Sequence, residues 1–442
     1  MVERKNISGW GLTPRIDAEI YTAYFPSNLT QPTIPQPFIP QGNRRSYGDA
    51  CLAKQVLSTL PLDNFIEFDP NQGLIKCEAG ITLSSILSFI VPRGYFLPVT
   101  PGTKDPTLGG CLAADVHGKN HHKEGSIANF TEEFELVLVD GTKVRCSRNE
   151  EAELFWATLG GMGLTGTIYT ATLRLKNISS SFIQTRTLKI NNLENLCDYF
   201  ANPRYQYTYS VAWIDTLSSQ VGRSLLMLGE HTENTQVKKL NNMALHSDQR
   251  WNIPFFFPAC ALNSLSMRIF NTLYYNKQLR RESNKLIHYD PYFYPLDSIG
   301  SWNRIYGREG FLQYQFVVPF DEGRDLIQLF LKKISERGIL SFLSILKTLG
   351  DESGGLLSFP KPGYTLALDI PLKNKGVIDF LSTLTKEIIR SGGRIYLAKD
   401  AIISKNDFVA MYPNLNEFKR IKKACDPHMH LRSSQSDRLG IT

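Results

Sequence analysis

Short runs of alternating hydrophobic and polar positions dominate the first 180 residues. Residues 65–69 (FIEFD) and 74–82 (LIKCEAGIT) alternate with period two and predict a β-hairpin, and residues 83–91 (LSSILSFIV) have the apolar spacing of a helix. Residues 134–146 (FELVLVDGTKVRC) predict two strands joined by a turn at Asp140-Gly141. Residues 149–161 predict a helix capped by Asn149 and ended by glycines, and residues 163–175 predict a long strand.

The pattern changes between about residues 180 and 195. Strand patterns at 207–215 (YTYSVAWID) and 311–319 (FLQYQFVVP) now alternate with long amphipathic helices at 323–338 and 375–393. This mixture predicts an α+β fold. We expect one domain over residues 1–190, a second over 191–392, and a C-terminal segment, 393–442, that returns to the first domain.

Composition narrows the class of protein. Apolar residues make up 42% of the chain and charged residues 21%, as in an ordinary soluble globular protein. The net charge of +7 permits an anionic substrate or membrane surface but gives no reason to expect nucleic acid. Seven cysteines without CxxC spacing indicate reduced thiols in a cytosolic protein. We find no signal peptide, and prolines and Arg268 interrupt the most apolar window, 251–270, so we predict a cytoplasmic protein.

Three glycine-bearing segments lie in the expected first domain: 40–50 (PQGNRRSYGDA), 101–118 (PGTKDPTLGGCLAADVHG) and 160–168 (GGMGLTGTI), here called the first, second and third glycine loops. Glycines let backbone N–H groups converge on an anion such as a phosphate. The third loop lacks the Lys-Ser/Thr of a phosphate-binding P-loop, and it leads into a strand, unlike a dinucleotide fingerprint. One such loop is as readily an ordinary turn, but three in this order are more specific.

The order of these motifs, followed by YLAKD (396–400) and ACDP (424–427), resembles flavoproteins of the vanillyl-alcohol oxidase type. Within that group the chain is most similar to the decaprenylphosphoryl-β-D-ribose 2′-oxidases, the flavin half of an epimerase, through HGKNHH, YTYSVAWID and GFLQYQFVVP as well. The resemblance implies a two-part FAD-binding domain of this type with an inserted substrate domain built on an antiparallel sheet flanked by helices.

The resemblance also implies a set of FAD contacts. The first loop would wrap the pyrophosphate, residues 114–117 would pass beside the isoalloxazine, and Gly166 and Thr167 would lie near the adenine. The implied FAD-binding residues are Gly42, Asn43, Arg44, Arg45, Ser46, Tyr47, Gly48, Asp49, Gly102, Thr107, Leu108, Gly109, Gly110, Ala114, Asp115, His117, Gly166, Thr167 and Tyr396. Some relatives attach FAD covalently through a histidine in the first loop; this chain has Arg45 there, so we predict noncovalent FAD.

Catalytic roles follow from the same resemblance. Lys399 would place a cation beside the reduced flavin, and a buried lysine of lowered pKa could also accept a proton. A surface lysine at a strand end is the plain alternative. His117 would donate a hydrogen bond near the ring or hold the reacting hydroxyl, and Tyr47 could reach the ring. His117, His121 and His122 lack the spacing of a helical metal site, and we predict no metal, a solvated polar loop being the plain alternative.

Substrate contacts are expected on the second domain and, through Lys119, on the first. Gln313 and Gln315 share one face of a strand and suit sugar hydroxyls, although a solvent-exposed polar face would show the same pattern. Lys119 would offer its cation to a substrate phosphate or hydroxyl. The remaining substrate-binding residues implied by the resemblance are Trp213, Tyr294 and Lys347.

The implied reaction is oxidation of the 2′-hydroxyl of a polyprenyl-phosphate-linked ribofuranose, the first half of a ribose-to-arabinose epimerisation in cell-envelope glycan synthesis. A separate short-chain dehydrogenase/reductase would complete it, and dioxygen or a quinone would reoxidise the flavin. The alternatives are an FAD oxidase of a free sugar, aldonolactone or alditol, and a flavin-free binding protein on the same scaffold.

Residues 233–285 hold eight Lys or Arg against three Asp or Glu, which permits peripheral contact with the inner membrane face. A mobile lid or a core helix would also fit this composition.

Overall fold

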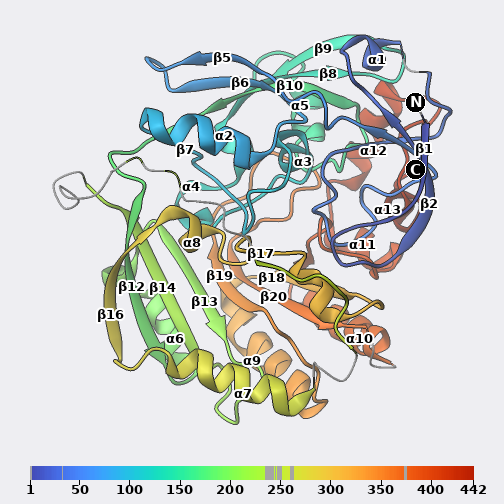
Figure 1. The fold of residues 1–442 in the computed structure, drawn as a ribbon. Coiled ribbons are helices and arrows are strands. Elements are labelled where there is room, and N and C mark those ends of the chain that lie inside the picture. The colour runs from blue at the N-terminus through green and yellow to red at the C-terminus, as the bar shows by residue number, and fades with distance from the viewer. Residues whose placement is uncertain are drawn as a thin grey trace.

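The computed structural model describes residues 2–31, 33–233, 243, 245, 251–258, 263–372 and 376–442. Two sheets form the upper part of the molecule (Figure 1). The first sheet has the order β1-β2-β4-β3, with β1 Val2–Ser8, β2 Arg15–Thr22, β3 Ile39–Gln41 and β4 Gln55–Ser58. The second sheet has the order β5-β6-β10-β8-β9, with β5 Phe65–Asp69, β6 Leu74–Glu78, β8 Thr131–Val137, β9 Lys143–Ser147 and β10 Thr167–Arg174.

Local patterns predicted most of these elements. The hairpin β5-β6, the hairpin β8-β9 and the strand β10 form as expected, and helix α2 covers Leu83–Ile90. The predicted Asn149 cap is wrong: helix α5 begins at Ala152 after Glu151, because the Ser147 hydroxyl accepts the N–H groups of Asn149 and Glu150 in a turn that precedes the helix. The other short elements of this part are α1 Ser27–Thr30, β7 Tyr95–Phe96, α3 Leu108–Ala113, α4 His121–Glu124, α5 Ala152–Thr158 and β11 Lys176–Asn177.

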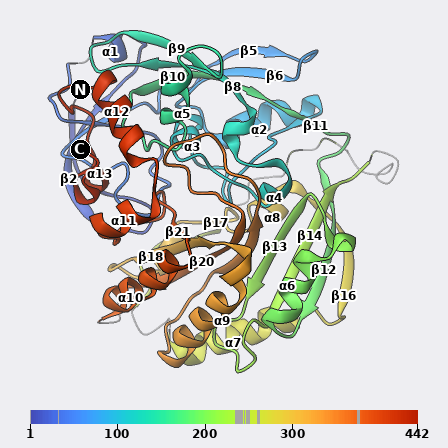
Figure 2. The ribbon, with the colours of Figure 1, turned by 180° about the vertical axis from the view of Figure 1, so that it is seen from behind.

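A larger antiparallel sheet forms the lower part, with the order β16-β12-β14-β13-β19-β20-β18-β21; we call it the large sheet. Its strands are β12 Phe182–Ile190, β13 Tyr209–Ile214, β14 Ser224–His231, β16 Glu282–His288, β18 Phe311–Val318, β19 Ser344–Leu349, β20 Gly363–Pro371 and β21 Arg394–Ile395. One face is covered by α6 Leu193–Ala201, α9 Phe320–Glu336 and α10 Val377–Arg390, which lie in front of the sheet in Figure 2. The α+β class is confirmed; the domain bounds stay a prediction.

Strand β18 explains how the large sheet separates two environments. Tyr314 and Phe316 point to the helix side, where the Tyr314 hydroxyl contacts Thr385 of α10 at 2.7 Å and Phe316 packs on Phe330 of α9. With a side-chain period of two, Gln313 and Gln315 must face the opposite side, toward the first part of the chain. The elements on that side and at the sheet edge are α7 Ser264–Asn276, α8 Tyr289–Phe293, β15 Trp251–Asn252 and β17 Ile299–Gly300.

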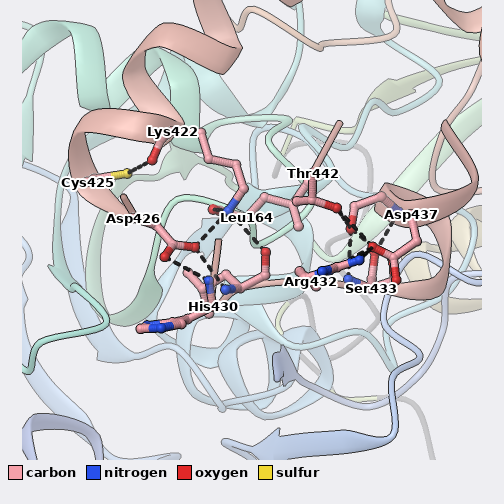
Figure 3. A network of polar contacts seen from close by, with 11 residues as sticks. Leu164, Lys422, Cys425, Asp426, His430, Arg432, Ser433, Asp437 and Thr442 are labelled. Carbon is pink, nitrogen blue, oxygen red and sulfur yellow. Dashed lines mark hydrogen bonds and ion pairs between the residues drawn. The ribbon is translucent and has the colours of Figure 1, made fainter. Parts of the chain in front are cut away.

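The last helices return to the first part of the chain and lie against its N-terminal strands in both views (Figures 1 and 2). They are α11 Lys405–Met411, α12 Leu415–Cys425 and α13 Ser434–Leu439. The Lys422 side chain of α12 is fully buried and donates to Asp426 and to the carbonyls of Leu164 and Leu431, at 2.9–3.0 Å (Figure 3). Because Leu164 belongs to the third glycine loop, this cation fastens the C-terminal segment to that loop.

Within the described ranges, no helix has both the length and the apolar character needed to cross a bilayer.

Candidate active site

A cavity of about 600 Å³ lies between the glycine loops and the free face of the large sheet. Its size is within the range of ordinary cofactor and ligand pockets. The predicted FAD-binding and catalytic residues on its lining are Gly42, Asn43, Arg44, Arg45, Ser46, Tyr47, Gly102, Thr107, Gly109, Gly110, Ala114, His117, Gly166, Thr167, Tyr396 and Lys399. Four predicted substrate residues join them: Lys119, Gln313, Gln315 and Lys347.

Four predicted FAD-binding residues lie behind the lining instead. Gly48 packs so tightly that a Cβ there would be 1.7 Å from the Asp400 carbonyl oxygen. The carboxylate of Asp49 accepts from Arg438 at 2.8–3.0 Å. Leu108 and Asp115 are also buried, and Asp115 accepts N–H and O–H groups from Ala128, Ser353 and Ser358. These residues shape the loops, and their contacts are with the protein.

Two predicted substrate residues also lie off the lining. Trp213 is on the cavity side of β13 but is covered by α7, where its ring packs 4.7 Å from that of Tyr274. The Tyr294 hydroxyl pairs with the Thr100 hydroxyl at 2.6 Å, and its neighbours Phe293 and Pro295 take the lining positions.

The glycine loops present backbone at close range, as a dinucleotide requires. A Cβ on Gly42 would be 2.1 Å from the Thr107 hydroxyl, so the first and second loops touch. Thr107 in turn caps α3 by accepting the Gly110 N–H at 3.2 Å. Arg45 and Asn43 both reach Asp105 of the second loop, by an ion pair of 3.1 Å and a hydrogen bond of 2.9 Å to its carbonyl. Backbone donors gathered in this way fit a pyrophosphate.

Lys399 reaches the cavity from the C-terminal segment. The Tyr47 N–H donates to the Ala398 carbonyl at 3.0 Å, and the Lys399 ammonium nitrogen lies 3.9 Å from the centroid of the Tyr47 ring. Burial lowers the pKa of Lys399 to about 7, although the charge of Asp369 acts in the opposite direction. The amine and the ammonium are therefore both available near neutral pH.

His117 stands between two residues of the large sheet. Its Nε2 lies 3.1 Å from the Gln315 amide nitrogen and its Nδ1 lies 3.3 Å from Nζ of Lys347. Burial, with the nearby Lys347 charge, holds the pKa of His117 well below its usual value, so its imidazole is neutral. His121 accepts the Gly350 N–H and His122 bonds to a backbone carbonyl, so the neighbouring histidines shape the loop.

Two further lysines give the cavity a positive lining. Nζ of Lys119 donates to the Tyr292 and Phe293 carbonyls, and burial with the Lys347 charge lowers the pKa of Lys119 to about 7. Burial lowers the pKa of Lys347 to about 8. Cations in a buried cleft attract and orient an anionic ligand. Among the described ranges, no cluster of three or more His, Cys, Asp or Glu is arranged to hold a metal ion.

Sequence reasoning missed two features of this site. Asp369 on β20 is fully buried next to Gln313, and residues 295–302 form one wall of the cavity. The only sequence signal for Asp369 was a single acidic residue within an apolar strand pattern. For the wall, the resemblance pointed to Tyr294 just before it but assigned no role to residues 295–302.

The fold and the loops define an FAD-binding oxidoreductase, and comparison with known proteins agrees. Residues 35–147 match the FAD binding domain family. The chain is 33% identical to the decaprenylphosphoryl-β-D-ribose oxidase of Mycolicibacterium smegmatis over 99% of its own length and 98% of that protein. It is 30% identical to an uncharacterised Streptomyces coelicolor protein over 82% of this chain and all of that one, and 25% identical to human Δ(24)-sterol reductase over 44% of this chain and 36% of that one. The chain belongs to the decaprenylphosphoryl-β-D-ribose oxidase family of FAD-dependent oxidoreductases.

Proposed function

We propose that this protein oxidises the 2′-hydroxyl of a polyprenyl-phosphate-linked ribofuranose to the 2′-keto sugar. The observation that carries the proposal is the cavity lining, where two amides of the large sheet and two half-buried lysines surround the same space: Gln313, Gln315, Lys119 and Lys347. Amides suit sugar hydroxyls, and ammonium groups suit a phosphate. The Mycolicibacterium smegmatis relative is named as an oxidase of a ribose that carries a decaprenylphosphoryl group.

Bound FAD supplies a hydride acceptor, and the residues of this chain supply orientation and proton transfer. Gln313 and Gln315 hold the ribose hydroxyls, and neutral His117 keeps Gln315 and Lys347 in place. The amine of Lys399 takes the proton of the reacting hydroxyl as the carbon loses its hydride. When FAD is bound, the Lys399 ammonium so formed would stabilise the negative charge that the cofactor gains with the hydride.

The lipid part of the substrate leads us to propose peripheral contact with an anionic membrane on its cytoplasmic side. Helix α7 exposes Leu265, Ile269 and Leu273 at 69%, 51% and 67%, a stripe spaced every four residues. Its opposite face packs against the protein, and exposed Arg268 and Lys277 flank the stripe. An apolar stripe beside basic residues suits an anionic bilayer surface. Residues 234–242, 244, 246–250 and 259–262 of the basic segment lie outside the described residues.

Three further parts of the proposal concern partners and attachment. FAD is held noncovalently, since the first loop carries Arg45, whose guanidinium is engaged with Asp105 and the Trp10 ring. A short-chain dehydrogenase/reductase reduces the keto sugar on the other face, and dioxygen or a quinone reoxidises the flavin. Release of free FAD on acid denaturation tests the first part.

The substrate is tested by anaerobic bleaching of the flavin absorbance. The panel contains polyprenyl-phosphate ribose, polyprenyl-phosphate arabinose, a neutral polyprenyl riboside without phosphate, and free pentoses and polyols. We expect fast bleaching only with polyprenyl-phosphate ribose, and slower bleaching without the phosphate. Bleaching by free polyols alone would show a free-sugar oxidase and overturn the substrate assignment. A purified protein without flavin would overturn the reaction itself.

A further inference from the structure

A buried carboxylate, Asp369, stands directly behind the cavity wall. It lies on β20 opposite Gln313 of β18 in the strand register, and its side chain has no exposed surface. The Gln313 side-chain N–H donates to Asp369 Oδ1 at 2.6 Å, and the Tyr306 hydroxyl donates to Oδ2 at 3.3 Å. Burying a carboxylate costs folding free energy unless hydrogen bonds or an opposite charge compensate it. A buried carboxylate at this position therefore indicates a functional role.

Asp369 and Lys399 act on each other electrostatically. Burial raises the pKa of Asp369 to about 7, while Gln313 and the Lys399 charge oppose the rise. Burial lowers the pKa of Lys399 to about 7, while the Asp369 charge opposes that fall. The carboxylate therefore makes Lys399 a stronger base than burial alone would leave it.

We propose that Asp369 is a positioning residue of the oxidation, which holds the Gln313 amide toward the sugar and stabilises the ammonium that Lys399 becomes. The proposal rests on the proposed function in its use of Lys399 as proton acceptor. The hydroxyl proton moves to Nζ of Lys399, the hydride moves to the flavin, and the sugar carbon becomes a carbonyl. Lys399 then returns the proton to solvent before the next substrate binds.

Other charged and titratable groups surround this pair, and all remain in place in the test. Tyr306 and Tyr47 face Asp369 from the wall and from the first glycine loop. Lys347 and His117 face Lys399. None of these supplies a negative charge at neutral pH, because burial raises the pKa of both tyrosines well above the usual value.

The first experiment measures the pKa of Lys399 in the FAD-loaded, substrate-free protein. The protein is labelled competitively with acetic anhydride across pH 5–10, and the modification of the Lys399 peptide is quantified by mass spectrometry. Asp369→Asn is expected to lower the pKa of Lys399 by about one or more. Asp215→Asn is the matched control: Asp215 is a buried carboxylate bound to Arg223 in the large sheet, and its loss should leave the Lys399 titration unchanged.

The second experiment follows anaerobic flavin reduction against pH. In Asp369→Asn the rising limb of the plot of reduction rate against pH should move to lower pH. The plateau rate should fall on the order of tenfold, because a weaker base accepts the proton less readily. Asp369→Glu should restore part of the wild-type limb position and part of the plateau rate. It replaces Asp369→Asn as the test variant if Asp369→Asn does not fold. An unchanged Lys399 pKa in the folded variant, or a lower plateau with an unmoved limb, would overturn the proposal. Because labelling needs no substrate, it still decides the role of Asp369 if the substrate assignment fails.

Discussion

Replacing Lys422 with methionine tests how the C-terminal segment is fastened to the third glycine loop. The Lys422 and Asp426 side chains are both fully buried, and Lys422 also satisfies the carbonyls of Leu164 and Leu431 (Figure 3). Methionine keeps the length and the apolar stem but removes the charge. Asp426 would keep only the N–H groups of His430 and Leu431.

The expected loss is large because a charge is left buried without its partner. Removing one member of a buried ion pair costs about 3–5 kcal/mol. A chain of 442 residues unfolds with an entropy on the order of 0.9 kcal/mol per kelvin, so Tm should fall by about 3–5 °C. Flavin should be released early in the transition, because Met162, Gly163 and Gly166 near Leu164 line the cavity.

The assay is thermal unfolding of the holoenzyme, followed by circular dichroism and by flavin fluorescence. Lys423→Met is the matched control, since Lys423 is the exposed neighbour in the same helix, and it should change Tm by less than about 1 °C. Lys422→Met/Asp426→Asn should recover part of the loss because the lone carboxylate is gone. A Tm for Lys422→Met equal to that of the control would refute the role assigned to this buried pair.

Two predictions concern the cavity. Lys399→Met should abolish flavin reduction while fold and FAD content are retained; in the wild type the rate should rise with pH through about 7, since the neutral amine that accepts the proton predominates above the pKa of Lys399. Stopped-flow reduction measures both, and near-normal reduction in the variant would remove Lys399 from the mechanism. Gly48→Ala should lower Tm and FAD content together, because its Cβ would be 1.7 Å from the Asp400 carbonyl oxygen and would push the first glycine loop away from the Lys399 segment. Wild-type flavin content and Tm in that variant would show that the contact is not required.

Local patterns were sufficient for much of the fold. Strands such as β13 and β18 and helices such as α9 and α10 form where the spacing of apolar residues places them, because burial of one face selects the element that presents it. The shared face of Gln313 and Gln315 likewise followed from strand geometry alone. The Asn149 cap was wrong because the Ser147 hydroxyl holds the N–H groups of Asn149 and Glu150 in a turn, and the helix starts only after that turn, at Ala152.

The amino-acid order also carried the motifs that indicate FAD, since glycines that must approach a pyrophosphate occupy fixed places in their loops. It could not show that Lys399 lies over the ring of Tyr47, that α7 covers Trp213, or that the charge of Asp369 acts on Lys399. These relations join residues from distant parts of the chain, and only packing brings them together. The shifted pKa values of the cavity lysines arise in the same way, because desolvation and neighbouring charges exist only after the two parts of the protein have closed around the cavity.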